Sequence, residues 1–182
     1  MANGRCGGLA LPEDYIVFDL ETTGFAPPKA EIIEIGAIRM VGGKVDDCFH
    51  SYVKPRGYLP RHITALTGIT ADMIDDAPRV DMVIPAFLTF IEKHPLTLVA
   101  HNAPFDCRFM NAFCSPLGID FDCYPVFDSL TAARAYVPLE SHKLELIKDY
   151  FGLEFNSHNA VDDCRVTAYL MEWCKAKSKG LL

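Results

Sequence analysis

An apolar run that ends in two carboxylates is the feature that most constrains the fold of this chain. Residues 15–18 (YIVF) are typical of a buried strand, and Asp19 and Glu21 follow at its end. Side chains alternate between the two faces of a strand, so both carboxylates point the same way. Neighbouring buried carboxylates repel one another and are costly to ionise. The pattern therefore requires compensation, which a hydrogen-bonded structural role, a shared proton or a divalent cation could supply.

The order of the predicted strands and helices indicates a layered α/β domain. Three strands come first, over residues 15–20, 31–45 and 48–55, and Gly42-Gly43 predicts a hairpin turn between the last two. Two more strands, within residues 96–102 and 124–128, alternate with helices. From apolar spacing and end signals, helices are predicted over residues 60–68, 76–94, 103–118, 129–137, 144–152 and 159–177. This order is typical of a mixed sheet with helices on its faces.

Two segments add detail to the helix predictions. Pro85 lies inside the apolar pattern of residues 76–94, where its ring removes a backbone hydrogen bond. We therefore expect that helix to kink or to start late. Near the end of the chain, Lys175, Lys177 and Lys179 are interpreted as a solvated helix end.

Length and composition indicate one globular domain. The chain has 182 residues, half of them hydrophobic, which is enough to bury a sizeable core. No apolar run approaches a membrane span, and residues 1–14 are too weakly apolar for a secretory signal, so we expect a cytoplasmic protein. The seven cysteines form no C-x-x-C pair and are interpreted as reduced thiols. We predict an N-terminal extension over residues 1–14, a domain over 15–175 and a short tail over 176–182.

The formal charge of −7 limits the ways in which this chain could bind nucleic acid. It argues against a protein that grips duplex DNA through phosphate neutralisation alone. It remains compatible with a nuclease whose acidic site is offset by cations, because two Mg²⁺ ions would reduce the formal charge of −7 to −3.

Acidic residues recur at the predicted strand ends and helix starts. Asp106 falls in the first turn of one helix, and Asp162 and Asp163 fall in the first turns of the last helix, with His158 just before it. In sheet-based folds the ligands of an active site collect at such positions. Hard cations such as Mg²⁺ prefer carboxylate oxygens, and histidine is suited to proton transfer near neutral pH. Together these residues favour metal-assisted phosphoryl transfer.

Taken singly, each of these residues has a simpler interpretation. An Asp-x-Glu pair at a strand end can be a surface or capping pair. Asp106 can be a helix N-terminal acid favoured by the helix dipole. Asp162 can be the third residue of a helix capped by Asn159, and His158 can be a solvated loop residue. Their joint order along the chain is what favours a shared site.

Three motifs in that order resemble a known family. The first is FDLETTG followed by EIIEIGAI, the second is HNAPFD, and the third is HNAVDDC, with the histidine five residues before the aspartate. Similar segments, HITALTGIT and SHKLELIKDYFG, lie between them. The chain resembles the DEDDh (DnaQ-like) 3′→5′ exonucleases, which include the proofreading epsilon subunit of bacterial DNA polymerase III. The resemblance extends from Tyr15 to Trp173.

The resemblance implies a fold and a catalytic set. The fold would be ribonuclease H-like, with five strands in the order 3-2-1-4-5, strand 2 antiparallel to the others, and flanking helices. Two divalent ions, Mg²⁺ or Mn²⁺, would be held by the four positions that match the family acids: Asp19, Glu21, Asp106 and Asp163. His158 matches the general base. Asp162 is the competitor of Asp163 for the last acidic position.

The resemblance also implies how the end of a substrate would be held. The backbone of residues 22–24 (Thr22, Thr23 and Gly24) would contact the terminal 3′-hydroxyl, and Leu20 would lie near the last base. Phe105 could stack on a base or pack on Phe109. Asn102 could contact substrate or cap the following helix.

Five further polar residues have a weaker connection to the site. His101 is interpreted as a satisfied strand-end histidine, and Asp128 as the cap of the helix that starts near Ser129. Arg61, His62 and Lys143 are weak candidates for contacts with phosphate.

The function predicted from these residues is a two-metal 3′→5′ exonuclease that releases nucleoside 5′-monophosphates from single-stranded 3′ ends. DNA is the favoured substrate, as in proofreading or repair. The alternatives are an RNA-trimming exoribonuclease and a polymerase-docking module with an idle nuclease site. A DNA polymerase subunit is the candidate protein partner, and the oligomeric state stays open. The chain ends nine residues after Trp173, so we expect a free-standing enzyme or one whose partner contacts the domain itself.

Overall fold

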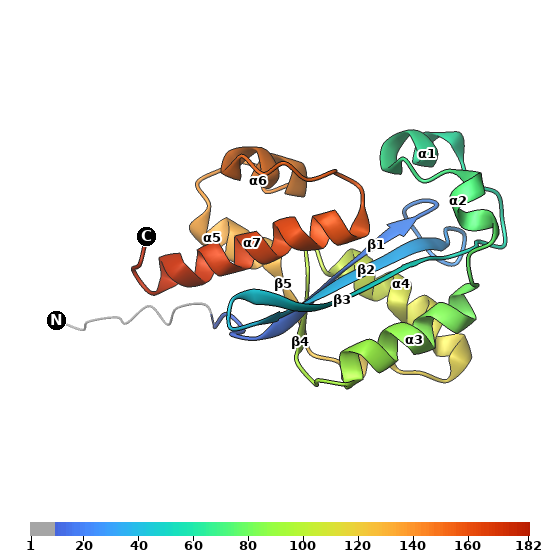
Figure 1. Ribbon diagram of the computed structural model, residues 1–182, viewed down its shortest axis with the longest axis horizontal. Coiled ribbons are helices and arrows are strands. Elements are labelled where there is room, and N and C mark those ends of the chain that lie inside the picture. Colours follow the sequence, from blue (N-terminus) through green and yellow to red (C-terminus); the bar gives the residue numbers. More distant parts are fainter. Residues whose placement is uncertain (1–9) are drawn as a thin grey trace.

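A five-stranded sheet forms the centre of the molecule in the computed structural model, which describes residues 10–182 (Figure 1). Its strands are β1 (Tyr15–Thr22), β2 (Ile32–Val41), β3 (Lys44–Tyr52), β4 (Thr97–Ala100) and β5 (Val126–Asp128). They lie in the order β3-β2-β1-β4-β5. Strand β2 is antiparallel to β1 and β3, whereas β4 and β5 run parallel to β1. The predicted order and directions are confirmed.

Helices cover both faces of the sheet. The longer ones are α3 (Val80–Glu92), α4 (Pro104–Cys114), α5 (Ser129–Tyr136), α6 (Leu144–Phe151) and α7 (Ala160–Ser178). Helices α3 and α4 lie on one face, and α5 and α7 lie on the other, with α6 against α7 (Figure 1). The shorter ones are α1 (Arg61–Thr67), α2 (Ala71–Asp75), η1 (Ser115–Leu117) and η2 (Phe121–Cys123).

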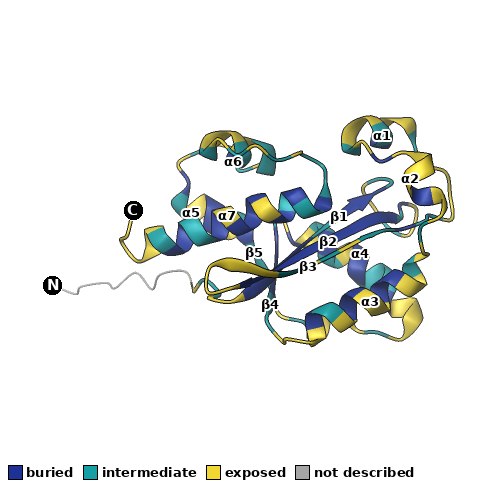
Figure 2. Ribbon diagram, viewed as in Figure 1, coloured by how far each residue is buried: buried dark blue, intermediate teal, exposed yellow. Residues whose placement is uncertain are grey.

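Alternation along β1 divides the core between these two layers. Ile16, Phe18 and Leu20 pack in the cluster that includes α3 and α4, whereas Tyr15 and Val17 pack in the cluster that includes α5, α6 and α7. Figure 2 shows β1 and β2 buried between helices whose outer surfaces are exposed. Since side chains alternate in direction, Asp19 and Glu21 lie on the α7 face of the sheet.

Strand β1 and helix α3 differ from their predicted extents. Strand β1 continues to Thr22, two residues beyond the prediction, because β2 pairs with it up to Thr22 and Ile32 across an irregularity in register. Helix α3 starts at Val80, four residues after the start of its predicted range, and continues through Pro85. Its buried apolar stripe explains this: one internal proline costs about 3 kcal/mol, and each fully buried large apolar side chain contributes about 1.5–3 kcal/mol.

The end of α7 corrects the interpretation of Lys175. The side chain of Lys175 is buried, its Nζ donates a 2.7 Å hydrogen bond to the Glu13 carbonyl, and it lies 2.7 Å from Glu172 Oε1. Lys175 therefore ties the last helix to the start of β1 instead of forming part of a solvated end. Lys179 adds a contact of 2.8 Å with the Glu13 carboxylate.

The described part of the chain begins within the predicted N-terminal extension. Of the N-terminal extension predicted over residues 1–14, residues 1–9 lie outside the described part of the chain. Among residues 10–182, no helix has the length and apolar character that crossing a membrane requires.

Candidate active site

A cavity of about 240 Å³, open to solvent, lies where β1 ends. The four predicted acids and His158 all line it, although they come from three separate parts of the chain. The other lining residues are Leu20, Thr22, Gly24, Phe25, Ile63, Leu66, His101, Asn102, Phe105, Leu144 and Glu145. The fold thus brings together every residue of the predicted catalytic set.

Strand β1 supplies two of the four carboxylates. Phe18 and Leu20 anchor the opposite face of the strand in the core, which directs Asp19 and Glu21 toward the cavity. The side chain of Glu21 is almost covered, with 8% exposure, and Asp19 is partly buried. The rigid central strand therefore fixes both acids.

Helix α4 supplies Asp106 in its first turn. Asp106 is only 2% exposed, so its carboxylate reaches the cavity from within the core. The start of the helix is fixed by Asp128 Oδ1, which accepts backbone hydrogen bonds from Asn102 at 3.0 Å and Ala103 at 3.3 Å. The same oxygen accepts from Leu130 N at 3.0 Å, which confirms the predicted cap of α5. Asp128 thus orders two helix starts from outside the cavity lining.

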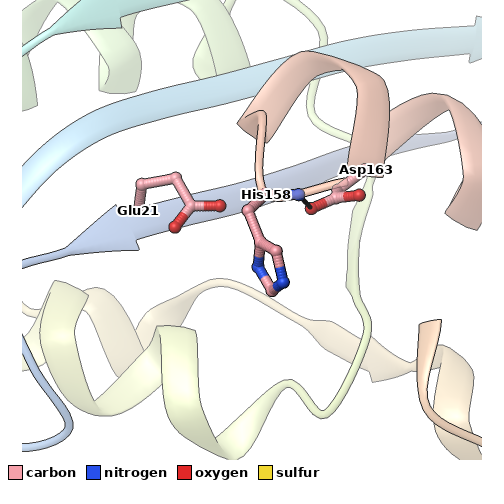
Figure 3. Close-up of side chains that lie close together, drawn as sticks. All are labelled: Glu21, His158 and Asp163. Carbon is pink, nitrogen blue, oxygen red and sulfur yellow. Dashed lines mark hydrogen bonds between the residues drawn. The ribbon is translucent and has the colours of Figure 1, made fainter. Parts of the chain in front are cut away.

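The start of α7 supplies His158 and Asp163. Asn159 caps the helix, and its side-chain oxygen accepts from Asp162 N at 3.0 Å. His158 has a left-handed backbone (φ 60°), and its backbone N–H donates to Asp163 Oδ2 at 3.0 Å. Ligand atoms of Glu21, His158 and Asp163 all lie within 4.8 Å of one another (Figure 3). His158 Nε2 also lies 3.3 Å from Glu145 Oε1 on α6.

Asp162, the competitor of Asp163, is occupied elsewhere. Its carboxylate accepts hydrogen bonds from Asn156 Nδ2 at 2.9 Å and Arg165 Nη1 at 2.5 Å, and it does not line the cavity. Burial alone would raise the pKa of Asp162, but the bonds from Asn156 and Arg165 outweigh it and lower the pKa. This geometry favours Asp163 as the acid of the third motif.

The four cavity acids have strongly perturbed proton affinities. Burial, with added repulsion from neighbouring carboxylates, raises the pKa of Glu21 to about 8 and holds that of Asp19 well above its ordinary value. Burial also raises the pKa of Asp106 to about 8, against backbone hydrogen bonds that lower it, and that of Asp163 to about 7. A divalent cation would replace these protons. The donor set, carboxylate oxygens beside one imidazole, fits a hard ion such as Mg²⁺ or Mn²⁺.

The predicted substrate contacts fall into two groups. Leu20, Thr22, Gly24, Asn102 and Phe105 line the cavity. Thr23 does not: its hydroxyl accepts from Glu31 N at 2.8 Å and its N–H donates to Glu31 O at 2.8 Å, which anchors the loop after β1.

The position of Phe105 is compatible both with stacking on a base and with packing on Phe109, whereas the position of Asn102 excludes a helix cap. The ring of Phe105 lies 5.0 Å from that of Phe109, so it packs on its own helix and also lines the cavity. The predicted cap by Asn102 was wrong. The capping position of α4 is Ala103, which has no side-chain acceptor, and Asn102 adopts a left-handed turn (φ 64°) before it.

His101 lines the cavity, whereas none of the three candidate phosphate contacts does. His101 has both ring nitrogens paired, with Ser129 Oγ at 2.9 Å and His142 O at 2.8 Å, as predicted. Its burial lowers its pKa. Lys143 lines a second hollow that shares His101 and Asn102 with the first, whereas Arg61 and His62 are exposed on α1.

Sequence reasoning missed several residues of this region. Phe25, 84% exposed, and Leu66, 51% exposed, present apolar surface at the cavity. Glu145 reaches His158 from α6, and Glu34 lies buried behind the cavity on β2. For Phe25, the available signal in the sequence was a large apolar residue directly after the first motif. For Glu34, the signal was an acidic residue that interrupts the apolar run of β2.

Comparison with known proteins identifies the family. Residues 16–171 match the RNase_T family model, described as exonuclease, so the chain belongs to this exonuclease family. A relative at 38% identity over 172 residues is the PolC-type DNA polymerase III of Clostridium perfringens (strain 13 / Type A), and the match covers 93% of this chain but 12% of that polymerase. The corresponding protein of Bacillus subtilis (strain 168) is 40% identical over 162 residues, which cover 87% of this chain and 11% of the relative. The chain thus spans a small part of these relatives.

Solved structures share the fold. Exonuclease X, in complex with 5′ overhanging duplex DNA, has a TM-score of 0.73 at 23% identity. The match covers 91% of this chain and 93% of the exonuclease X chain. The nuclease domain of 3′hExo, a DEDDh family member bound to rAMP, has a TM-score of 0.76 at 20% identity, with 93% and 94% of the two chains covered. The ribonuclease H-like fold and the resemblance to the DEDDh exonucleases are therefore confirmed.

Proposed function

We propose that this protein is a 3′→5′ exonuclease that uses two divalent cations to release nucleoside 5′-monophosphates from single-stranded DNA ends. One observation supports this more than any other: four carboxylates and His158, from three separate motifs, converge on one cavity of an exonuclease-family domain. An idle docking module would have no need of such a costly cluster of buried acids.

Asp19, Glu21, Asp106 and Asp163 would hold the cations, Mg²⁺ or Mn²⁺. When bound, these ions would supply the positive charge that stabilises a phosphodiester transition state. Burial and mutual repulsion raise the pKa values of these acids, so bound cations would relieve a site that otherwise favours protons.

His158 acts as the general base in this proposal. Its backbone is fixed by Asp163, while its ring reaches the cavity beside Glu145. The imidazole takes a proton from the attacking water as oxygen bonds to phosphorus. The bond from phosphorus to the 3′ oxygen of the preceding nucleotide then breaks, that oxygen takes up a proton from water to become a hydroxyl, and the terminal nucleotide departs as its 5′-monophosphate.

The 3′-terminal nucleotide occupies the rest of the cavity. The backbone of residues 22–24 contacts the 3′-hydroxyl, and Leu20, Phe105 and Asn102 surround the sugar and base. Exposed Phe25 and Leu66 offer further apolar surface on which a base can stack or pack.

DNA is the proposed substrate because the relatives at 38–40% identity are DNA polymerases. We also propose that the protein acts beside a DNA polymerase, in the cytoplasm, with the nuclease domain spanning residues 15–175. Since the relatives are much longer than this chain, the partner could be a separate protein or further parts of the same one.

Digestion of matched 5′-labelled single-stranded DNA and RNA oligonucleotides tests the proposal. We expect a ladder that shortens from the 3′ end of DNA, requires Mg²⁺ or Mn²⁺, and vanishes with EDTA. Asp19→Asn removes one charge and almost no volume, so it should fold and fail to cut. Preferential shortening of RNA would replace DNA by RNA as the substrate. A missing ladder on both substrates would support the idle docking module, and cleavage by Asp19→Asn at the wild-type rate would refute the metal assignment.

A further inference from the structure

Glu34 is a fully buried carboxylate that the proposed chemistry does not use. It lies on β2 with 0% exposure, directly across the strand pair from Glu21. Cross-strand partners share a face of the sheet, so Glu34 lies on the α7 side with the cavity acids. It does not line the cavity. A buried negative charge so near Glu21 is unfavourable unless it is strongly compensated.

The compensation comes from the start of α7 and from β3. Glu34 Oε2 accepts a hydrogen bond from Ala160 N at 3.2 Å, the first residue of α7. Asn159 Nδ2, from the capping residue, lies 3.4 Å from Glu34 Oε1. His50 Nε2, on the edge strand, lies 2.7 Å from the same oxygen. The carboxylate therefore joins β2, β3 and the N-terminus of a 19-residue helix.

Gly36 shows how closely the helix approaches the strand at this point. A Cβ atom on Gly36 would lie 2.6 Å from the Ala160 carbonyl carbon and 2.7 Å from Val161 N. The third neighbour, Ala160 Cβ at 2.8 Å, is attached directly to that backbone, so no flexible side chain could move aside. The position of the first turn of α7 is thus set by β2 itself, through Gly36 and Glu34.

Two residues of the proposed catalytic set flank this contact. His158 lies two residues before Ala160 and Asp163 three residues after it, and Asp163 N donates to Asn159 O at 2.9 Å. A displacement of the first turn would therefore carry His158 and Asp163 away from Glu21 on β1. Displacements of about 1 Å are enough to cost catalysis heavily.

We propose that Glu34 is a positioning residue of the nuclease site. It fixes the first turn of α7 against β2, so that Asp163 and His158 meet Glu21 around the cation, and His50 holds the carboxylate from the solvent side. This inference rests on the proposed function for its catalytic consequence. The anchoring itself can be measured without any catalysis.

Two variants and one control test the inference. Glu34→Ala removes the acceptor, whereas Glu34→Gln keeps an acceptor oxygen and removes the charge. The control is Glu172→Ala, which removes the carboxylate that accepts from Tyr15 Oη at 2.7 Å and ties the far part of the same helix to β1. Mn²⁺ affinity by calorimetry, amide hydrogen exchange of Ala160 and Asp163, and kcat and KM on single-stranded DNA are measured for each.

We expect Glu34→Ala to weaken Mn²⁺ binding by about 10–100-fold, the usual effect of losing a residue that supports metal ligands. Amide exchange at Ala160 and Asp163 should accelerate, and kcat should fall more than KM rises. Glu34→Gln should show a smaller change in all three, and Glu172→Ala should lower stability but leave Mn²⁺ affinity unchanged. Wild-type Mn²⁺ affinity and wild-type exchange in Glu34→Ala would overturn the inference.

His50→Ala keeps the test decisive if Glu34→Ala does not fold. His50 is only partly buried and lies on the edge strand, so its removal should leave the fold intact. His50→Ala should shift Mn²⁺ affinity and amide exchange in the same direction as Glu34→Ala. Unchanged Mn²⁺ affinity and unchanged exchange in both His50→Ala and Glu34→Gln would overturn the inference. If wild-type protein bound no Mn²⁺ and cut nothing, the proposed function would fail, while amide exchange would still report the anchoring.

Discussion

At the scale of single residues, the site depends on which of two adjacent aspartates faces the cavity. Asp162 is paired with Asn156 and Arg165, and Asp163 reaches Glu21 and His158. We expect Asp163→Asn to lower kcat by at least 100-fold and to abolish tight Mn²⁺ binding. Asp162→Asn should cost stability, about 1 kcal/mol for its hydrogen bonds, with kcat within a few-fold of wild type. Steady-state kinetics and thermal melts check both, and the reverse ranking would show that Asp162 is the metal ligand.

His158 provides a second prediction at the same scale. If it is the general base, His158→Ala should lower kcat by about 10²–10⁴-fold, the usual contribution of general base catalysis. Mn²⁺ affinity should stay within a few-fold of wild type, because the carboxylates still bind the ion. Calorimetry and single-turnover cleavage measure the two quantities separately. Loss of Mn²⁺ binding in the variant would assign His158 as a ligand.

At the scale of the elements, the contact between β2 and α7 determines whether the catalytic set assembles. Gly36→Ala would place a Cβ against the α7 backbone, so the helix or strand must move. Overpacking of this kind typically costs about 1–3 kcal/mol of the free energy of unfolding, and we expect Mn²⁺ affinity to fall as well. Denaturant unfolding and calorimetry measure these effects.

Gly57→Ala is the matched control for that substitution. A Cβ there would meet Glu31 Oε2 at 3.5 Å, an ordinary contact, and no atom of α7 would lie within 4 Å of it. We expect it to leave stability within about 0.5 kcal/mol and Mn²⁺ affinity unchanged. A Gly36→Ala protein as stable and as tightly metal-binding as the control would refute the close approach of helix and strand.

At the scale of the whole molecule, the buried acids couple folding to pH and to metal. In the unfolded chain carboxyl groups titrate near pH 4, whereas in the folded protein the pKa of Asp163 is about 7 and those of Glu21 and Asp106 are about 8. Between about pH 4 and about pH 8, the folded state therefore binds more protons than the unfolded state. The free energy of unfolding attributable to these acids therefore falls as the pH rises from about 4 to about 8.

Metal should reverse this trend. Cations bind the folded state and displace protons, so the gain in Tm from Mg²⁺ or Mn²⁺ should be small near pH 5 and largest near pH 8. Thermal melts with EDTA or with saturating cation, across that range, measure the difference. A gain in Tm that does not grow with pH would contradict the assignment of these acids as the metal site. Glu21→Gln, which removes one titrating ligand, should flatten the dependence.

Much of the fold followed from local patterns in the sequence. The apolar run before Asp19, the turn at Gly42-Gly43 and the helical spacing of apolar residues each depend on interactions between near neighbours. The order of strands and the four acids came from the resemblance of three motifs to a family. Helix α2 was missed because five residues are too few to show a period.

The remaining features depend on residues that are distant along the chain. Local sequence contains the strand and helix periods, the caps and the motif acids, because these arise from chemistry within a few residues. It contains neither the burial of Lys175 against Glu13 nor the joining of Glu34 to Ala160. Each of these contacts forms only when β1, β2 and α7 pack together, and their packing sets the distances on which the proposed chemistry depends.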